Sequence, residues 1–326
     1  MAAVLLASRR VLVTGHADPD GDVAGGCSAL FCALRRLGKD VVVFNPDPFP
    51  PGYRHLPGAE ALVHRLPDDA HFDATVILDA AQRVRVDAFL PRAAADRGKV
   101  LWIDHHPLIA PSGDLEWVDE DASSMGEMLF HLIPLLGVRV DREIGMGLYA
   151  SLLADTGGFR YESTTTAALR LAASLLEAGV HPWEVAEQVY ERQPVERVML
   201  LSRVLSTLRL SGSGRFASVV VRERDLTETG ATAAMTDGMI NHARGIDGVE
   251  MAGQLEELGA ERWRVTLRSR GGMEAGAVSK LLGERGHRFG ACFVRTGPLD
   301  TVRAELERAV DDVANTLGLP PASPDR

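Results

Sequence analysis

The sequence predicts an α/β protein with an N-terminal doubly wound, mostly parallel sheet and a smaller C-terminal α/β domain that has a mixed sheet. Two observations lead to this fold class. In the first half of the chain, short β-branched runs alternate with segments of helical periodicity, which is typical of βαβ units. After about residue 195, probable strand pairs replace this alternation, and the first pair flanks a Ser/Gly turn. A length of 326 residues suits two domains.

The N-terminal elements follow from apolar runs and capping residues. Buried parallel strands are predicted at residues 11–14, 41–44, 75–78 and 100–103. Helical periodicity predicts helices at residues 22–37, 123–136, 144–154, 164–177 and 183–191. We expect Gly38 to end the first of these helices and Ser123 to cap the second.

The C-terminal part begins with a predicted helix at residues 195–208 that bridges the two lobes. Strands are predicted at residues 207–210, 215–221, 249–255, 262–268 and 290–295, and helices at 275–282 and 299–317. Residues 320–324 are expected to fray. We therefore expect a first domain at 1–190, a linker helix at 191–209, a second domain at 210–318, a flexible tail at 319–326, and a cleft between the domains.

Composition limits the classes of partner and compartment. The content of 46% hydrophobic and 25% charged residues is that of a globular protein. A net charge of −10 argues against a protein that coats long nucleic acid, although bound cations can reverse the local field for a short anionic substrate. The 3 cysteines form no CxxC pair, and no 18-residue apolar run is present. We expect a cytoplasmic protein that has no membrane partner.

The segment His-Ala-Asp-Pro-Asp-Gly-Asp at residues 16–22 is the most informative part of the sequence, because it directly follows a predicted strand. Open α/β sheets place their ligands at this carboxyl end of the strands. Carboxylates packed this tightly repel one another unless protons or cations neutralise them. Three more apolar runs end in such groups, at Asp79, at Asp104-His105-His106 and at Asp155.

A mixed set of carboxylates and imidazoles suits Mn²⁺, with Mg²⁺, Co²⁺ or Fe²⁺ as alternatives. One aspartate at a strand end is more often a cap, and adjacent histidines can form a buried pair, but the recurrence at four element ends favours a metal site. Six ligands suit two ions about 3.5–4 Å apart, which favours metal-assisted phosphoester hydrolysis. The candidate ligands are His16, Asp20, Asp22, Asp79, His105 and Asp155.

Together these motifs resemble those of the DHH phosphoesterase family, in the branch of nanoRNases (oligoribonucleases) and pAp phosphatases with a DHH-associated C-terminal domain. The resemblance rests on HADPDGD at 16–22, Leu78-Asp79, the Asp104–His106 triplet, the segment at 121–127 and LADTGGFRY at 153–161. It spans nearly the whole chain. The resemblance implies that residues 1–190 are the catalytic domain and that residues 210–318 bind substrate.

The resemblance also implies a role for each site residue. His16 and Asp20 would hold one ion, Asp22, His105 and Asp155 the other, and Asp79 would bridge them. His106 would act at the scissile phosphate and Asp104 would orient a histidine. Asp18 is expected outside the ligand set. We interpret Arg160 as a phosphate clamp, because its guanidinium can pair with phosphate bidentately.

In the second domain the family usually carries a glycine-rich run that ends in histidine. Here the run reads Gly283-Glu284-Arg285-Gly286-His287, so two glycines are replaced by larger residues. Side chains restrict the close approach of backbone to a phosphate or base. We expect Gly286 and His287 to bind substrate, Arg285 to add a charge contact, and Arg268 to contact an anion. The departure puts substrate choice in question more than catalysis.

The resemblance implies a phosphoesterase that uses two divalent ions, preferably Mn²⁺, to release mononucleotides from short oligonucleotides such as linear pGpG or pApA. The compound 3′-phosphoadenosine 5′-phosphate (pAp) is a further expected substrate, and long duplex nucleic acid is not. Manganese-dependent inorganic pyrophosphatase and cyclic dinucleotide phosphodiesterase are alternative activities. A nucleotide-sensing module without turnover is the non-enzyme alternative. A homodimer is expected from the family, although no segment of this sequence specifies an interface.

Overall fold

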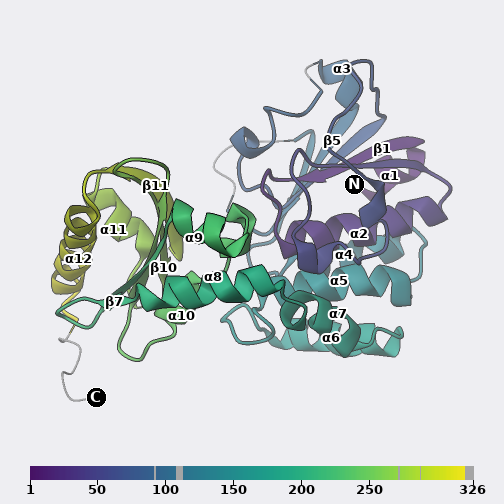
Figure 1. Ribbon diagram of the computed structural model, residues 1–326. Coiled ribbons are helices and arrows are strands. Elements are labelled where there is room, and N and C mark those ends of the chain that lie inside the picture. Colours follow the sequence, from purple (N-terminus) through teal and green to yellow (C-terminus); the bar gives the residue numbers. More distant parts are fainter. Residues whose placement is uncertain (92, 108–112, 271, 287, 320–326) are drawn as a thin grey trace. The chain divides into compact units, whose positions relative to one another are not determined.

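The structure is a computed structural model that describes residues 1–91, 93–107, 113–270, 272–286 and 288–319. The chain divides into two units, Met1–Arg192 and Gln193–Arg326 (Figure 1). His287 and residues 320–324, both part of the sequence predictions, lie outside the described residues. In the described part of the chain, no helix has the length and apolar character needed to cross a bilayer.

Six parallel strands form the sheet of the first unit, in the order β3-β2-β1-β4-β5-β6. The chain runs outward from β1 to one edge and then from β4 to the other, so the strand order reverses at the β1–β4 pair. In open α/β sheets, ligands bind at the carboxyl ends of the strands at such a switch point. The strands are β1 (Arg10–Gly15), β2 (Asp40–Phe44), β3 (Leu62–Val63), β4 (Ala74–Leu78), β5 (Lys99–Asp104) and β6 (Leu115–Val118). The four predicted strands are confirmed, and the short edge strands β3 and β6 were not predicted.

Two helices, α2 (Gly21–Arg36) and α4 (Met125–Leu135), pack on one face of this sheet, and α5 (Arg142–Asp155) packs against both of them (Figure 1). Glycines let α2 and α5 approach closely. A Cβ at Gly147 would lie 2.7 Å from the carbonyl oxygen of Gly25, and a Cβ at Gly25 would overlap the Gly147 carbonyl. This close approach brings the N-terminus of α2 next to the C-terminal turns of α5.

The opposite face of the sheet is covered by residues 66–72 and 80–90, whose one regular element is the 3-10 turn Arg83–Arg85. Phe72, Val86 and Leu90 pack there against Ile77 and Trp102 of the sheet. The remaining helices of the first unit are α1 (Ala2–Ala7), α3 (Ala94–Arg97), α6 (Thr166–Glu177) and α7 (Pro182–Ala186), with 3-10 turns at Pro51–Tyr53, Ala59–Ala61 and Arg83–Arg85.

Two helix predictions need correction. The predicted N-cap Ser123 is wrong, because Ser124 caps α4 by accepting the backbone N–H of Glu127, while the Ser123 hydroxyl donates to the Glu127 carboxylate. The helix predicted at 183–191 is α7 followed by a π-helical turn, Glu187–Glu191. Gly38 does follow α2 in the left-handed region, with φ of 71°.

The second unit has a mixed five-stranded sheet in the order β11-β10-β9-β8-β7, in which β8 and β9 are parallel and the other pairs antiparallel. Its strands are β7 (Arg209–Leu210), β8 (Phe216–Val221), β9 (Met251–Glu257), β10 (Arg262–Ser269) and β11 (Gly290–Thr296). Its helices are α8 (Val195–Ser206), α9 (Glu223–Thr229), α10 (Ile240–Arg244), α11 (Ala275–Leu281) and α12 (Leu299–Thr316). The α8 helix, predicted as a bridge, packs its buried Leu200 and Val204 against β8. The short helices α9 and α10 were not predicted.

Candidate metal centre

The turn after β1 positions the first two candidate ligands. Asp20 caps α2, accepting the backbone N–H groups of Asp22 and Val23 at 3.0 and 3.1 Å. The buried His16 donates from Nδ1 to the carbonyl of Ala17 at 2.8 Å. This bond leaves Nε2 of His16 facing Asp20, 3.7 Å from Oδ2. A backbone carbonyl that fixes the other ring nitrogen is the usual support of a metal-binding histidine.

Asp79, directly after β4, stands at the middle of the site. Its backbone is left-handed, with φ of 52°, a conformation that non-glycine residues rarely adopt. One carboxylate oxygen lies 3.6 Å from Nε2 of His16. The other lies 3.5 Å from Nε2 of His105 and 3.0 Å from Nδ1 of His106. This one buried carboxylate therefore faces three imidazoles.

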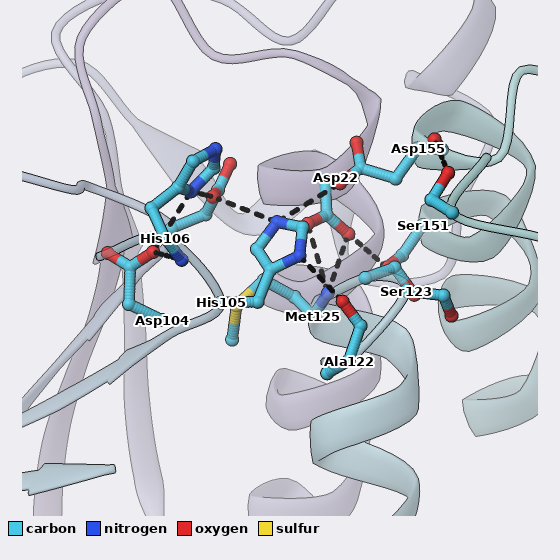
Figure 2. Close-up of polar contacts among 12 residues, drawn as sticks. Asp22, Asp104, His105, His106, Ala122, Ser123, Met125, Ser151 and Asp155 are labelled. Atoms are coloured by element: carbon cyan, nitrogen blue, oxygen red, sulfur yellow. Dashed lines mark hydrogen bonds and ion pairs between the residues drawn. The ribbon is translucent and has the colours of Figure 1, made fainter. Parts of the chain in front are cut away.

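His105 lies between two further carboxylates (Figure 2). Its Nδ1 donates to the carbonyl of Ala122 at 3.1 Å. Its Nε2 lies 3.0 Å from Asp155, at the C-terminus of α5, and 3.5 Å from Asp22 on α2. Figure 2 shows the ring directed toward both carboxylates.

Asp22 is held by two residues that the sequence analysis missed. The backbone N–H of Met125 donates to both carboxylate oxygens of Asp22, at 3.1 and 3.0 Å. The buried hydroxyl of Ser151 donates to Asp22 and also accepts the N–H of Gly126 at 2.6 Å. A serine in the middle of a helix carries no distinctive signal in the sequence, and only the close approach of α2 and α5 reveals its position.

Asp104, at the end of β5, supports His106. One oxygen accepts the backbone N–H and lies 3.0 Å from Nδ1 of His106. The other accepts the indole N–H of Trp102 at 3.1 Å and the N–H of Ala81 at 2.6 Å. The contacts with Asp79 and Asp104 both involve Nδ1, so Nε2 of the half-exposed His106 ring is the nitrogen left for a substrate.

The carboxylates shift the pKa values of the imidazoles strongly. Burial lowers the pKa of His16, but Asp20 and Asp79 outweigh it and raise the pKa to about 10. The same balance raises the pKa of His105 to about 12 and that of His106 to about 10. Without cations, protons on these rings neutralise the site.

The pKa values of the buried carboxylic acids shift in opposite directions. Burial raises the pKa of Asp79, but the three surrounding imidazoles lower it further, to well below its usual range. Burial and the neighbouring carboxylates raise the pKa of Asp22, while burial raises that of Asp155 to about 6.

The donor set fits divalent cations. The buried Oδ1 of Asp79 and Nε2 of His105 make no hydrogen bond within the described chain, although both stand among polar atoms. Carboxylates and imidazoles together suit borderline cations such as Mn²⁺. The candidate ligand atoms form three overlapping groups, each within 4.8 Å: His16, Asp20 and Asp79; Asp22, His105 and Asp155; and Asp79, His105 and His106. The first two groups have no residue in common, and the third shares Asp79 with the first and His105 with the second.

The other predicted site residues lie in both units. Arg160, in the turn after α5, donates from Nε to the carbonyl of Gly157 at 2.6 Å. In the second unit, Arg268 is half-buried on β10 and Arg285 is exposed after α11. Gly286 is exposed, and a Cβ there would lie 2.7 Å from Ala291. Asp18 is exposed and belongs to none of the three groups.

Comparisons with known proteins agree with this geometry. Residues 10–154 match the DHH family, N-terminal domain. The chain is 32% identical, over 92% of its length and 91% of the relative's, to the bifunctional oligoribonuclease and PAP phosphatase NrnA of Thermus thermophilus. The chain belongs to the DHH family. Within that family it lies in the NrnA branch, since it is also 27% identical to NrnA of Bacillus subtilis over 91% of this chain and 93% of the relative.

A solved structure shares the fold of the chain beyond the residues that the family model matches. An exopolyphosphatase-related protein from Bacteroides fragilis superposes with a TM-score of 0.88, at 22% identity, covering 97% of this chain and 96% of that chain. At this identity the likeness shows the fold alone.

Proposed function

We propose that this DHH-family chain is a phosphoesterase that uses two divalent cations to hydrolyse short oligonucleotides and pAp to mononucleotides. Mn²⁺ is the cation that we propose ahead of Mg²⁺ and Co²⁺. One observation carries the proposal: at the switch point of the sheet, the group of Asp79, His105 and His106 shares Asp79 with one of the other ligand groups and His105 with the second. Overlapping groups suit two adjacent ions. The substrate class is that named for NrnA of Thermus thermophilus.

The groups support a division of the ligands between the two ions. His16 and Asp20 would hold one ion, Asp22, His105 and Asp155 would hold the other, and Asp79 is the carboxylate proposed to serve both. When bound, such cations neutralise charge on a phosphoryl oxygen and activate water for in-line attack. The net charge of −10 then presents no barrier to a short anionic substrate, because the ions reverse the field locally.

The chain's own residues move the proton and orient the phosphate. His106 keeps Nδ1 toward Asp104 and Asp79, so Nε2 is free to give a proton to the leaving oxygen. The pKa of about 10 keeps that ring protonated at neutral pH without cations. Arg160, fixed at Nε, directs the rest of its guanidinium toward a phosphate. In the second unit, Arg268, Arg285, Gly286 and His287 are proposed to contact the substrate's anionic groups.

A substrate panel with Mn²⁺ tests the function. Linear dinucleotides, longer oligomers, cyclic dinucleotides, pAp and pyrophosphate are compared by mononucleotide or phosphate release. We expect release from linear dinucleotides and pAp and little from pyrophosphate. Faster release from pyrophosphate or from cyclic dinucleotides favours those alternative activities, and tight binding without turnover favours a sensing module.

Two histidine variants locate the chemistry. His105→Ala removes a ring that faces three carboxylates, so we expect loss of turnover on every substrate. His131→Ala is the matched control, because this exposed ring on α4 belongs to none of the ligand groups. Normal turnover by His105→Ala would exclude the mechanism.

A further inference from the structure

All 4 tyrosines of this 326-residue chain belong to the first unit. Tyr149 is buried on α5, and its ring centroid is 6.3 Å from that of Phe159. The other three reach the surface, and we call Tyr53, Tyr161 and Tyr190 the tyrosine rim. Each residue of the rim contacts a segment that carries candidate metal ligands.

Tyr53 packs against the turn that carries Asp20 and Asp22. A Cβ on Gly21, the residue between them, would overlap the Tyr53 ring, so the ring lies directly on the backbone there. The preceding Gly52 would place a Cβ 3.0 Å from Cα of Val189. The contact of Gly52 with Val189 makes Tyr53 continuous with the π-helical turn that carries Tyr190.

Tyr190 contacts the last turns of α5, which carry the candidate ligand Asp155. Its hydroxyl donates to the carbonyl of Leu153, two residues before Asp155, at 3.2 Å. The same hydroxyl would lie 3.4 Å from a Cβ at Gly158. Tyr190 belongs to the turn Glu187–Glu191, and π-helical turns of this kind are frequent at functional sites.

Tyr161 completes the rim. Its ring lies across Gly157, which comes two residues after Asp155. The φ of Gly157 is 57°. Tyr161 and Tyr190 are each 40% exposed, which is unusual for large aromatic side chains that a core would bury. Arg160 directly precedes Tyr161 in the chain, and its Nε donates to the Gly157 carbonyl of the same turn.

We propose that a nucleobase stacks on the tyrosine rim, and that this base belongs to the nucleotide whose phosphate is hydrolysed. The inference rests on the proposed function and names how that site recognises its substrate. Every base has a π face, so stacking on aromatic rings is strong but tolerant of sequence. The rim therefore makes the enzyme require a base next to the phosphate without requiring a particular base. A cationic Arg160 beside the rings adds attraction for the phosphate of the same nucleotide.

A thermodynamic cycle that combines protein variants with substrate analogues tests this assignment. Steady-state kinetics with Mn²⁺ compare the wild type, Tyr161→Leu and Tyr161→Phe on pApA and on two analogues that lack one adenine, either the 5′ or the 3′ base. For Tyr161→Leu we expect KM on pApA to rise roughly tenfold with kcat within about twofold, since one stack is worth a factor of this order. Tyr161→Phe keeps the ring and is expected to behave as the wild type.

The analogues separate stacking from structure. On one of the two abasic analogues, Tyr161→Leu is expected to raise KM no further, because the stacked base is already missing. Trp183→Leu changes a 63% exposed aromatic residue of the same unit outside the rim and should leave KM unchanged. An equal rise on all three substrates, or no rise on pApA, overturns the rim. Wild-type protein without turnover on pApA instead refutes the proposed function, and the rim with it.

Discussion

The hydroxyl of Ser151 makes a sharp test of how the site is built. Ser151 is fully buried, donates to Asp22 and accepts from the N–H of Gly126. In Ser151→Ala the Gly126 N–H loses its acceptor, which costs about 1–3 kcal/mol for a buried group. Asp22 loses one of the hydrogen bonds to its charge, worth about 1.5–3 kcal/mol. Since the two losses share one atom, we expect a total of about 2–4 kcal/mol in the free energy of unfolding.

For a unit of this size the loss corresponds to a fall in Tm of about 5–15 °C. Because Asp22 is then less well oriented, Mn²⁺ affinity is expected to fall about 10- to 100-fold. Thermal unfolding and calorimetric titration with Mn²⁺ measure both quantities. Ser174→Ala is the control, since this exposed serine donates only to the Arg170 carbonyl of its own helix. If Ser151→Ala behaves like Ser174→Ala in both assays, the supporting role of Ser151 is wrong.

Three further predictions concern the ions and the helix contact. Mn²⁺ binding should release protons near pH 7 and strengthen as pH rises, because the ions displace protons from the ligand rings of His16 and His105, whose pKa values are about 10 and 12; calorimetric heats that do not depend on the buffer's ionisation enthalpy would contradict this. At 100 times its Kd, Mn²⁺ should stabilise the fold by about 2.7 kcal/mol and raise Tm by about 5–11 °C. EDTA should reverse the rise, and an equal rise in His105→Ala would show that the ion binds elsewhere. Gly147→Ala should cost about 1–3 kcal/mol in urea unfolding, because a Cβ there would lie 2.7 Å from a backbone nitrogen of α2. Gly212→Ala, with no atom within 4 Å of the added Cβ, should change stability by no more than about 0.5 kcal/mol, and equal losses would refute the close contact.

The strand-end groups could be predicted from sequence because the rule involved is local. His16, Asp79 and Asp104 each follow a continuous apolar run, and parallel strands bring their carboxyl ends to one sheet edge. Asp155 ends a helix instead of a strand, yet the same reading of apolar runs found it. The division of the six candidate ligands between two ions came only from the resemblance, since spacing along the chain does not specify which side chains meet.

What sequence reasoning missed depends on contacts between distant segments. Ser151 is one small residue among many on an apolar helix until α2 packs beside it. The π-helical turn at Tyr190 continues a helical pattern and differs only in its hydrogen-bond register. The capping error between Ser123 and Ser124 arose because both residues are good caps, and only the hydrogen bond to Glu127 distinguishes them. The helices α9 and α10 are too short for periodicity to show.

The bonds that orient Asp22 connect residues far apart in the chain. Its partners Met125 and Ser151 lie 103 and 129 residues away. Contacts between residues this far apart in the chain are slow to form, because closing a long loop costs entropy before the contact is made. A partly folded chain therefore presents single carboxylates with little hold on a cation, and the complete ligand set arises only when the first unit has folded. Binding of the proposed cations would therefore depend on the native topology of this unit.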